Sequence, residues 1–355
     1  MKDLGKKIDV LARDILPDLI QLRRHLHAHP ELSGQEYQTA ALVAGELRKA
    51  GWEVKEAVGK TGVVAELGSN SGPIVGLRVD MDALPIEEKT GLDYSSSTQG
   101  LMHACGHDLH TCIGLGVAKV LAKNEFTNSR VRIIFQPAEE IAQGAKWMKA
   151  ENVLEGLQGL FGVHVYPDLP VGKIGIRSGT FTAAAGELEI DIIGNGGHGA
   201  RPHEGVDSIW ISAKVISGLQ EAISRRLDAL KPVVISFGKI SGGSAFNVIA
   251  DSVKLLGTVR CLDTNLYEKL PLWIEKIVKN IASTYGAQAH VNFKSIAPPV
   301  YNDPKLTNLL SNCAKNFMEE KDIVYLENPS LGAEDFAFLL QDVRGTMFRL
   351  GVAGD

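Results

Sequence analysis

Side chains that can bind metal are concentrated in one short stretch of the sequence, HACGHDLH (103–110). It places three histidines, a cysteine and an aspartate within eight residues, directly before an apolar helical pattern. Imidazole and thiolate groups suit a borderline-soft cation such as zinc, and they also suit manganese or cobalt where carboxylates join them. Taken alone, the stretch leaves a second interpretation open, which is a capped helix that carries surface histidines.

Two further segments offer the other groups that metal-assisted hydrolysis requires. In FQPAEE (135–140), the adjacent Glu139 and Glu140 point in different directions if the backbone is extended or turned, so one can bind a cation while the other faces water. His164 interrupts the apolar strand pattern of FGVHVYP (161–167). By themselves, these segments are most simply two solvated glutamates and a core histidine. Combined with the first stretch, they favour a Lewis acid beside a general base.

Two weaker patterns also contain groups of this kind. LRVDMDALP (77–85) places Asp80 and Asp82 after a strand, where acidic residues most often form turns or cap helices. GNGGHGARPHEGVD (194–207) exposes His198 on a glycine-rich turn. The alternative for this histidine is an ordinary surface position on a flexible loop.

The elements that must position these groups follow from hydrophobic periodicity. Before residue 182, strand and helix patterns alternate, as is typical of an α/β layer built on a mostly parallel sheet. Four of the segments described above lie at or just after the carboxyl ends of predicted strands, where open α/β sheets place their ligands. They are LRVDMDALP, HACGHDLH, FQPAEE and FGVHVYP. The expected strands are Val63–Leu67, Ile74–Val79, Val131–Phe135 and Gly159–Val165, and the expected helices are Ile8–Leu26, Tyr37–Ala50, Leu109–Ala122 and Gly144–Ala150.

The first of these helices contains two features that need interpretation. Pro17 is expected to kink the helix or to start a second one. His25, His27 and His29 alternate at its end, but alternate residues do not share a helix face. We therefore do not interpret these histidines as a row of ligands.

The pattern changes near residue 182. Residues 182–295 follow the order β-α-β-β-α-β, which is typical of a two-layer α+β module of the ferredoxin-like kind with an antiparallel sheet. We therefore predict a discontinuous catalytic domain, residues 1–181 and 296–355, with residues 182–295 inserted as a second domain. The expected elements of the insertion are the strands Gly186–Ile193, Pro232–Ile240, Ser252–Leu262 and Ala287–Ser295 and the helices Val206–Leu230 and Leu266–Thr284.

Composition excludes several classes of partner. The chain has 355 residues with Lys plus Arg 37 and Asp plus Glu 42, and its formal charge of −5 gives no reason to expect binding to nucleic acid or to an anionic membrane. Its longest apolar stretch, 112–122, contains Lys119 and is shorter than the roughly 20 residues of a membrane span. The four cysteines are scattered, which argues against a disulfide framework. We expect a cytoplasmic protein.

Successive motifs of the sequence resemble a known family. They are RRHLHAHPEL, LRVDMDALP, HACGHDLHT, QPAEE, GVHV, GGHGARPHEGVD, FNVIAD, GTVR and GAEDF. They resemble the N-acyl-amino-acid amidohydrolases, a group with hippurate hydrolase, aminoacylase-like enzymes and auxin-conjugate hydrolases, within the dinuclear metallocarboxypeptidase family. The resemblance implies an α/β catalytic domain with two divalent metal ions (Zn, Mn, Co or Ni) and an inserted lid domain that commonly mediates homodimerisation. The implied reaction is hydrolysis of the amide bond of a small N-acyl-amino acid, such as an acetyl or benzoyl conjugate.

The resemblance also implies roles for residues of the catalytic domain. By position, Glu139 corresponds to the general base. Asp82 lies at the strand end where other branches of the family carry a His-x-Asp ligand motif, and here it is expected to support a ligand from behind. The residues that correspond to metal ligands are Cys105, His107, Glu140 and His164.

Three positions of the lid domain correspond to functional positions of the family. His198 matches a lid histidine that, in dimers of this family, reaches into the partner subunit's active site and stabilises the tetrahedral oxyanion. Asn247 and Arg260 match positions that face the substrate. Arg260 is the candidate for holding the substrate carboxylate through paired hydrogen bonds.

One departure from the family keeps other functions open. Family members continue beyond the RLGVAG motif (349–354) with a tail that carries a final histidine ligand, whereas this sequence stops at Asp355 and its last histidine is His290. The nearer alternative is a dipeptidase or carboxypeptidase with the same metal centre. The other is a non-catalytic, metal-poor relic, a dimer that binds acyl-amino acids without cleaving them.

Overall fold

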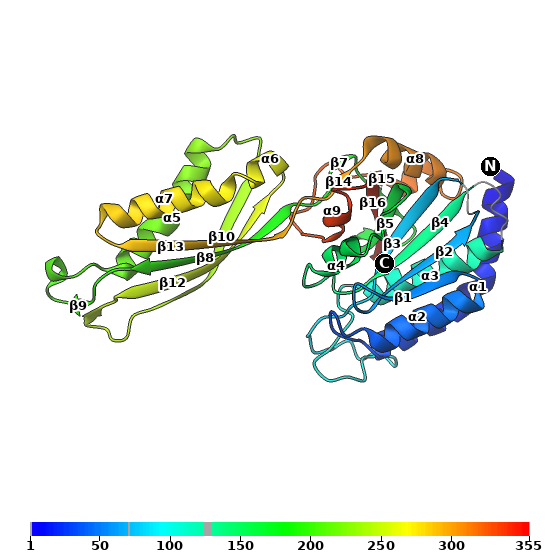
Figure 1. The fold of residues 1–355 in the computed structure, drawn as a ribbon, viewed down its shortest axis with the longest axis horizontal. Coiled ribbons are helices and arrows are strands. Elements are labelled where there is room, and N and C mark those ends of the chain that lie inside the picture. The colour runs from blue at the N-terminus through cyan, green and yellow to red at the C-terminus, as the bar shows by residue number, and fades with distance from the viewer. Residues whose placement is uncertain (1, 70–71, 124–128, 355) are drawn as a thin grey trace. The chain divides into compact units, whose positions relative to one another are not determined.

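The computed structural model describes residues 2–69, 72–123 and 129–354 (Figure 1). The chain divides into two compact units. Unit 1 comprises residues 1–181, 301–328 and 334–355, and unit 2 comprises residues 182–300 and 329–333. Met1 and Asp355, the two ends of the predicted catalytic domain, lie outside the described residues. Within the described part of the chain, no helix combines the length and the apolar character that a membrane span requires.

Unit 1 is built on an eight-stranded sheet with the order β1-β2-β4-β3-β5-β16-β6-β15. The central pairs β4–β3, β3–β5 and β5–β16 are parallel, whereas β1–β2, β2–β4 and β16–β6 are antiparallel. The strands are β1 (Glu53–Val58), β2 (Gly62–Gly68), β3 (Ile74–Asp80), β4 (Arg130–Gln136), β5 (Leu157–Pro170), β6 (Ile174–Ile176), β15 (Ile323–Tyr325) and β16 (Gly345–Ala353). The short strands β7 (Gly179–Thr180) and β14 (Tyr301–Asn302) pair separately.

The two faces of this sheet are covered differently. Val79, Phe135 and Val163 point into the core that includes residues of α1, α2 and α3. Gly162 points to the opposite face, where a Cβ atom would lie 3.2 Å from the Phe336 ring of α9. The helices of unit 1 are α1 (Lys2–Ala28), α2 (Tyr37–Lys49), α3 (His107–Ala122), α4 (Gly144–Ala150), α8 (Pro304–Ala314) and α9 (Phe336–Leu339), with a 3-10 turn at Glu320–Asp322.

Unit 2 has an antiparallel four-stranded sheet with the order β10-β12-β8-β13. This confirms the two-layer α+β architecture with an antiparallel sheet that was predicted for the inserted segment. Leu188, Ile190 and Ile192 of β8 alternate into a core shared with the helices α5 and α7. The elements are β8 (Ala184–Ile193), α5 (Ser208–Arg226), β10 (Val233–Gly242), β12 (Ser252–Cys261), α6 (Thr264–Tyr267), α7 (Leu270–Thr284) and β13 (Gln288–Ala297). A small separate ladder joins β9 (Gly197–His198) to β11 (Val248–Ile249), next to a 3-10 turn at Pro202–Glu204.

The predicted fold class, a mostly parallel α/β domain with an inserted α+β domain, is confirmed, and three local features differ from or refine the sequence-based expectation. Helix α1 continues through Pro17, which lies on an exposed position where water can satisfy the carbonyl that loses its partner. The helix expected at 266–284 is two helices, because Pro271 lies in the first turn of α7 and lacks an N–H group. Strand β1 was not predicted from the sequence, because its side chains are mostly exposed.

Candidate metal centre

A glycine turn sets the start of the candidate site. Gly106 separates Cys105 from the first residue of α3 and has φ = 85°, a left-handed conformation that favours glycine. A Cβ atom at Gly106 would lie 2.5 Å from the Val165 side chain of β5. Because the turn approaches β5 this closely, Cys105 and His107 are placed beside the carboxyl-terminal half of that strand.

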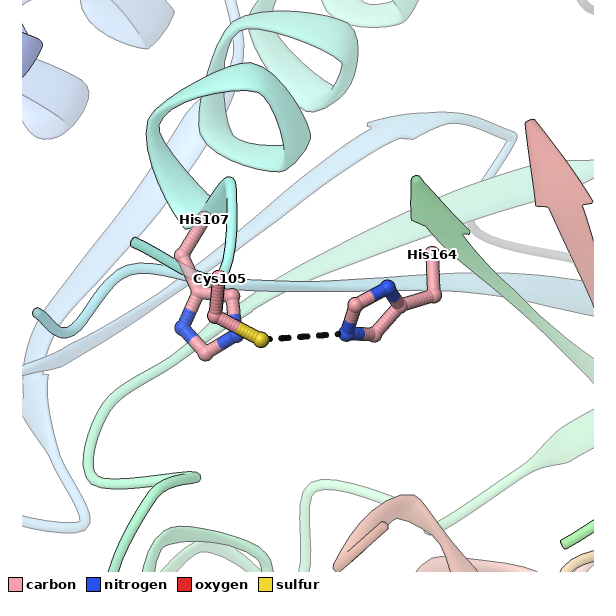
Figure 2. Close-up of side chains that lie close together, drawn as sticks. All are labelled: Cys105, His107 and His164. Carbon is pink, nitrogen blue, oxygen red and sulfur yellow. Dashed lines mark hydrogen bonds between the residues drawn. The ribbon is translucent and has the colours of Figure 1, made fainter. Parts of the chain in front are cut away.

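Cys105 and His164 meet across this contact, as Figure 2 shows. The Cys105 Sγ atom lies 3.5 Å from His164 Nε2. The Nδ1 atom of His164 lies 2.7 Å from the Val165 carbonyl oxygen, so Nδ1 donates and Nε2 keeps its lone pair. Burial lowers the pKa of His164 to about 4, so the imidazole is neutral near pH 7. A neutral imidazole with a free Nε2 lone pair is ready to bind a cation.

His107 is oriented by a carboxylate behind it. Its Nδ1 atom lies 3.2 Å from Asp82 Oδ1, and the other oxygen of Asp82 accepts hydrogen bonds from Ser33 Oγ at 2.6 Å and from the Glu140 backbone N–H at 3.0 Å. The Nε2 atom of His107 faces the Glu140 Oε1 atom at 3.8 Å. Asp82 therefore fixes both a ring and the backbone of the glutamate opposite it, in the manner of a carboxylate that supports a metal ligand.

Unpartnered buried atoms show what these residues are suited to bind. Among the described residues, His107 Nε2 and Glu140 Oε1 are buried and have no hydrogen-bond partner. Buried polar atoms are rarely left without a partner, and a shared cation would satisfy both of these. Cys105, His107 and His164 offer ligand atoms within 4.8 Å of one another, and His107, Glu139 and Glu140 form a second such group. The donor set of thiolate, imidazole and carboxylate fits divalent transition metals.

Glu139 points to a different set of neighbours from Glu140. Its Oε1 atom accepts a hydrogen bond of 3.2 Å from the Asp335 backbone N–H, and its ligand atoms group with Glu334 and Asp335. Burial, together with the negative charges of Glu334 and Asp335, raises the pKa of Glu139 well above its usual range. Perturbed carboxyl groups of this kind are typical of general acid–base sites.

The arginine at the centre of these carboxylates was not predicted from the sequence. Arg78 is fully buried, and its guanidinium contacts Asp80 at 2.7 Å, Asp335 at 2.9 Å and Glu334 at 3.0 Å. Two signals could have revealed it. An arginine in an otherwise apolar strand needs a buried partner, and the adjacent acids of the GAEDF motif repeat the pattern of Glu139 and Glu140.

A second missed residue holds the turn that contains the paired glutamates. Glu36 is fully buried and accepts hydrogen bonds from the backbone N–H groups of Gly34 and Ala138, each at 2.8 Å, and from Thr61 Oγ1. Ala138 adopts φ = 53°, a conformation that costs free energy for a residue other than glycine. Glu36 therefore helps to fix the backbone immediately before Glu139.

The alternating His25, His27 and His29, at and just after the end of α1, have partners other than the candidate ligands. His27 is buried between Asp108 at 2.7 Å and Glu88 at 3.1 Å. The rings of His25 and His29 contact each other at the surface, tilted by 34° with centroids 4.4 Å apart. None of the metal-type groups formed by the described residues includes any of these histidines.

The candidate residues of unit 2 do not form one cluster within that unit. His198 is exposed on β9, opposite Val248 in the ladder, and Asn247 lies beside it because its carbonyl accepts a 2.8 Å hydrogen bond from the Gly199 N–H. Both line a hollow of about 860 Å³. Arg260 lies near the opposite end of β12 from the residues that line this hollow. One of its nitrogens donates to Thr258 Oγ1 and the Val259 carbonyl.

The comparisons with known proteins identify the family. The model of peptidase family M20/M25/M40 matches residues 76–355. The chain belongs to this family. It is a metal-dependent enzyme that hydrolyses amide bonds, which confirms the class of protein expected from the motifs.

Individual relatives differ in what their names say. The chain is 54% identical to a probable hydrolase of Synechocystis over 96% of this chain and 88% of the relative. It is 39% identical to an N-acetyl-L-cysteine deacetylase of Bacillus subtilis (95% and 81%) and 40% identical to thermostable carboxypeptidase 1 of Saccharolobus solfataricus (99% and 90%). The crystal structure of a Bacillus subtilis protein described as a dinuclear metal binding peptidase is similar with a TM-score of 0.83 and 35% identity, over 97% of this chain and 90% of that one.

Proposed function

We propose that the protein is an N-acyl-amino-acid amidohydrolase, which cleaves a small N-acyl-amino acid to a carboxylate and a free amino acid. The observation that carries the proposal is the convergence of Cys105, His107, Glu140 and His164 beside the spare carboxyl group of Glu139. The relative named N-acetyl-L-cysteine deacetylase supports this substrate class.

We assign the metal ligands to Cys105, His107, Glu140 and His164, with Asp82 behind His107. Two divalent cations per subunit (Zn, Mn, Co or Ni) fit this donor set, and the similar protein described as dinuclear supports the pair. Bound there, the cations would supply positive charge that polarises the acyl carbonyl and makes water more acidic.

In this proposal, the residues of the chain carry the proton and orient the reacting groups. Glu139 takes a proton from the attacking water at its free carboxylate oxygen, while the Asp335 N–H group holds the other oxygen. The amide C–N bond breaks as Glu139 returns this proton to the leaving nitrogen. A hydrogen bond from His198 stabilises the oxyanion that forms between these steps, and Asn247 and Arg260 contact the substrate.

We further propose a homodimer formed through the inserted domain, residues 182–295, so that His198 acts on the active site of the partner subunit. Residues 1–181 and 296–355 are then the catalytic domain of each subunit. The exposure of His198 on β9 supports a role toward a second molecule. A reducing compartment such as the cytoplasm suits Cys105, because only the reduced thiol can bind a cation.

A second candidate function is a carboxypeptidase with the same metal centre. It is favoured by the 40% identity to a relative that is named a carboxypeptidase. The two functions differ in the group on the acyl side of the scissile bond, which is a simple acyl group in one case and an amino acid or peptide in the other.

The first prediction tests the substrate class. Purified protein loaded with manganese or zinc is expected to hydrolyse N-acetyl- and N-benzoyl-amino acids with at least a tenfold higher kcat/KM than dipeptides. Release of the free amino acid, measured with an amine-reactive dye or by mass spectrometry, gives both rates. Treatment with a chelator is expected to abolish the activity, and added metal is expected to restore it.

Two results other than this preference for N-acyl-amino acids would indicate a different function. A preference for dipeptides would replace the amidohydrolase by the carboxypeptidase. A protein that binds N-acyl-amino acids but cleaves neither class, with fewer than two metals per chain by elemental analysis, would be the metal-poor relic.

The second prediction concerns the carboxylate behind His107. Asp82→Asn is expected to weaken metal binding by about 10- to 100-fold, because the amide neither fixes the His107 tautomer nor increases its basicity as a carboxylate does. Competition with a chromogenic chelator measures this affinity. Asp93→Asn, at an exposed position, is the matched control and is expected to keep the original affinity. Equal affinities for the two variants would remove Asp82 from the support of the site.

A further inference from the structure

We infer that His110 of α3 is a positioning residue of the metal centre, which orients the candidate ligand His164 through the backbone of Val165. This inference rests on the metal ligands assigned in the proposed function. His110 is fully buried, and neither the candidate ligand set nor the proposed reaction uses it. Its ring centroid lies 5.4 Å from that of His107 and 4.6 Å from that of His164, yet both of its nitrogens are occupied by other partners.

The partners of His110 fix which of its nitrogens carries the hydrogen. The Nε2 atom lies 2.8 Å from the backbone nitrogen of Val165, and a backbone N–H group can only donate, so Nε2 must accept. The hydrogen is then on Nδ1, which donates to Asp80 Oδ1 at 2.5 Å. The other oxygen of Asp80 accepts a hydrogen bond of 2.7 Å from Arg78. His110 therefore connects the end of β3 to the backbone of β5 in one defined orientation.

His110 takes the place of a strand partner that β5 lacks at this point. The ladder between β3 and β5 ends at the pair Arg78–Gly162, whereas the ladder with β16 on the other side of β5 continues past Val165. Beyond Gly162, the edge of β5 that β3 covered therefore has no strand partner in the described sheet. The Val165 N–H group binds a side chain of α3 there instead. Without His110, this N–H group would lose its acceptor, which is costly for a buried donor.

Val165 links two of the candidate ligands. His164 Nδ1 donates to the Val165 carbonyl oxygen at 2.7 Å, so the direction of the ring follows the Val165 backbone. The Val165 side chain also packs against the turn that follows Cys105, where a Cβ atom on Gly106 would lie 2.5 Å from it. By holding the Val165 backbone, His110 therefore helps to set the 3.5 Å separation between Cys105 Sγ and His164 Nε2. Groups that orient ligands in this way change the affinity for the metal.

The alternative is that His110 itself binds a cation, because Asp80, His107 and His110 also offer ligand atoms within 4.8 Å of one another. Most of these atoms are already used. Both nitrogens of His110 are occupied, and the two oxygens of Asp80 accept from His110 and Arg78. Of the three residues, only His107 has a buried side-chain atom without a hydrogen-bond partner among the described residues. The geometry thus favours a supporting role for His110 over direct ligation.

The test uses two amide side chains that imitate the two halves of the imidazole. The terminal group of glutamine reaches the place of Nε2, where its oxygen can accept the Val165 N–H. The terminal group of asparagine reaches the place of Nδ1, where its N–H can donate to Asp80, and it leaves Val165 without an acceptor. His110→Asn is expected to weaken metal binding about 10- to 100-fold, whereas His110→Gln is expected to stay close to the wild-type affinity.

Cobalt is the probe for this measurement. The metal-free protein is titrated with cobalt in competition with a chelator, and the absorption band that arises when a thiolate binds cobalt is followed. The band reports on Cys105 and is expected to be absent from Cys105→Ser. It therefore measures binding at the cluster that contains His164, which a general loss of stability would not change in a folded variant.

Thr111→Val is the matched control. Thr111 is the next residue of α3, is fully buried and donates to the Asp80 carbonyl oxygen at 2.8 Å. Its substitution removes a buried hydrogen bond from the same turn of the helix and is expected to leave the cobalt affinity unchanged. Circular dichroism and thermal unfolding verify that each variant is folded.

If His110→Asn does not fold, proton–nitrogen correlation NMR of the wild-type protein with nitrogen-labelled histidine carries the test. The signals of His110 are identified by their loss in His110→Gln. The inference requires a hydrogen on Nδ1 of His110 and none on Nε2, so a hydrogen on Nε2 would overturn it.

The remaining outcomes separate this inference from the proposed function. The inference is overturned if His110→Asn keeps the wild-type affinity, if His110→Gln loses as much affinity as His110→Asn, or if Thr111→Val does. It is also overturned if cobalt gives no thiolate band with the wild-type protein. A wild-type protein that shows the expected order of cobalt affinities but hydrolyses neither N-acyl-amino acids nor peptides would contradict the proposed function and still support the role of His110.

Discussion

Replacing Glu139 by glutamine is expected to lower kcat by about 10²- to 10⁴-fold while the bound metal is retained. Glutamine has the shape of glutamate, and its carbonyl oxygen can still accept the hydrogen bond that the Asp335 N–H group now donates at 3.2 Å. What it lacks is the ability to take a proton from water and to return it to the leaving nitrogen. The loss should therefore fall on kcat more than on KM.

The comparison with its neighbour makes this prediction specific. Glu140→Gln, at the adjacent position that faces His107 Nε2 at 3.8 Å, is expected to lower metal content as well as activity. Glu155→Gln, at an exposed position of unit 1, serves as the neutral control. Elemental analysis and steady-state rates measured on the same samples separate the three variants. Full activity in a metal-loaded Glu139→Gln protein would exclude Glu139 as the base.

The cluster of candidate ligands could be anticipated from the sequence because residue type carries much of the information. Cys105, His107 and His164 belong to types that metals select, and the sequence pattern placed them at or after the predicted ends of strands, although the observed β5 continues past His164 to Pro170. Topology then brings these ends together, which is why a distance of 3.5 Å between Cys105 and His164 follows from segments far apart in the chain. The hydrophobic periodicity of the strands and helices gave the fold class in the same way.

The supporting residues could not be found by this reasoning. Glu36, Arg78 and Asp335 act through contacts with backbone groups or with one another, and such contacts depend on the three-dimensional path of the chain rather than on residue type. Asp335 comes from a segment that returns to unit 1 after the inserted domain. The local sequence pattern around Asp335 does not indicate which strand this segment will contact. A buried charge is recognised as buried only when its surroundings are known.

Element boundaries were missed for a related reason. The helix predicted for residues 206–230 is observed as Ser208–Arg226. It begins where the Asp207 side chain accepts hydrogen bonds from the N–H groups of Ile209 and Trp210. Val206, the predicted first residue, instead pairs with Asn195. Apolar periodicity continued across this cap, so periodicity alone placed the start too early.

Replacing Arg78 by methionine is expected to lower the free energy of unfolding of unit 1 by about 3–5 kcal/mol, which is a large fraction of a typical domain's stability. The side chain is fully buried, and its removal leaves Asp80, Glu334 and Asp335 without their shared cation. These carboxyl groups must then be protonated or hydrated inside the sheet, and both alternatives cost free energy.

Unfolding of unit 1 must be followed separately, because a chain of two units does not unfold as one transition. In a Trp210→Phe/Trp273→Phe background, the remaining tryptophans, Trp52 and Trp147, lie in unit 1, and their fluorescence in urea reports on that unit. Arg48→Met is the matched control. The Arg48–Glu56 ion pair has side chains 54% and 41% exposed, and its loss is expected to cost less than about 1 kcal/mol.

A second substitution distinguishes ion pairing from simple packing. If Arg78 matters because it compensates buried negative charge, Asp335→Asn in the Arg78→Met background should recover part of the lost stability, and the double-mutant cycle should show a coupling of about 1 kcal/mol or more. Additive effects would mean that the side chain acts through its volume alone. The same pair bears on catalysis, because the Asp335 N–H group holds Glu139. Arg78 donates a hydrogen bond of 2.9 Å to the Asp335 side chain and so fixes its position. Loss of the arginine should therefore lower kcat even in the fraction of protein that remains folded with its metal bound.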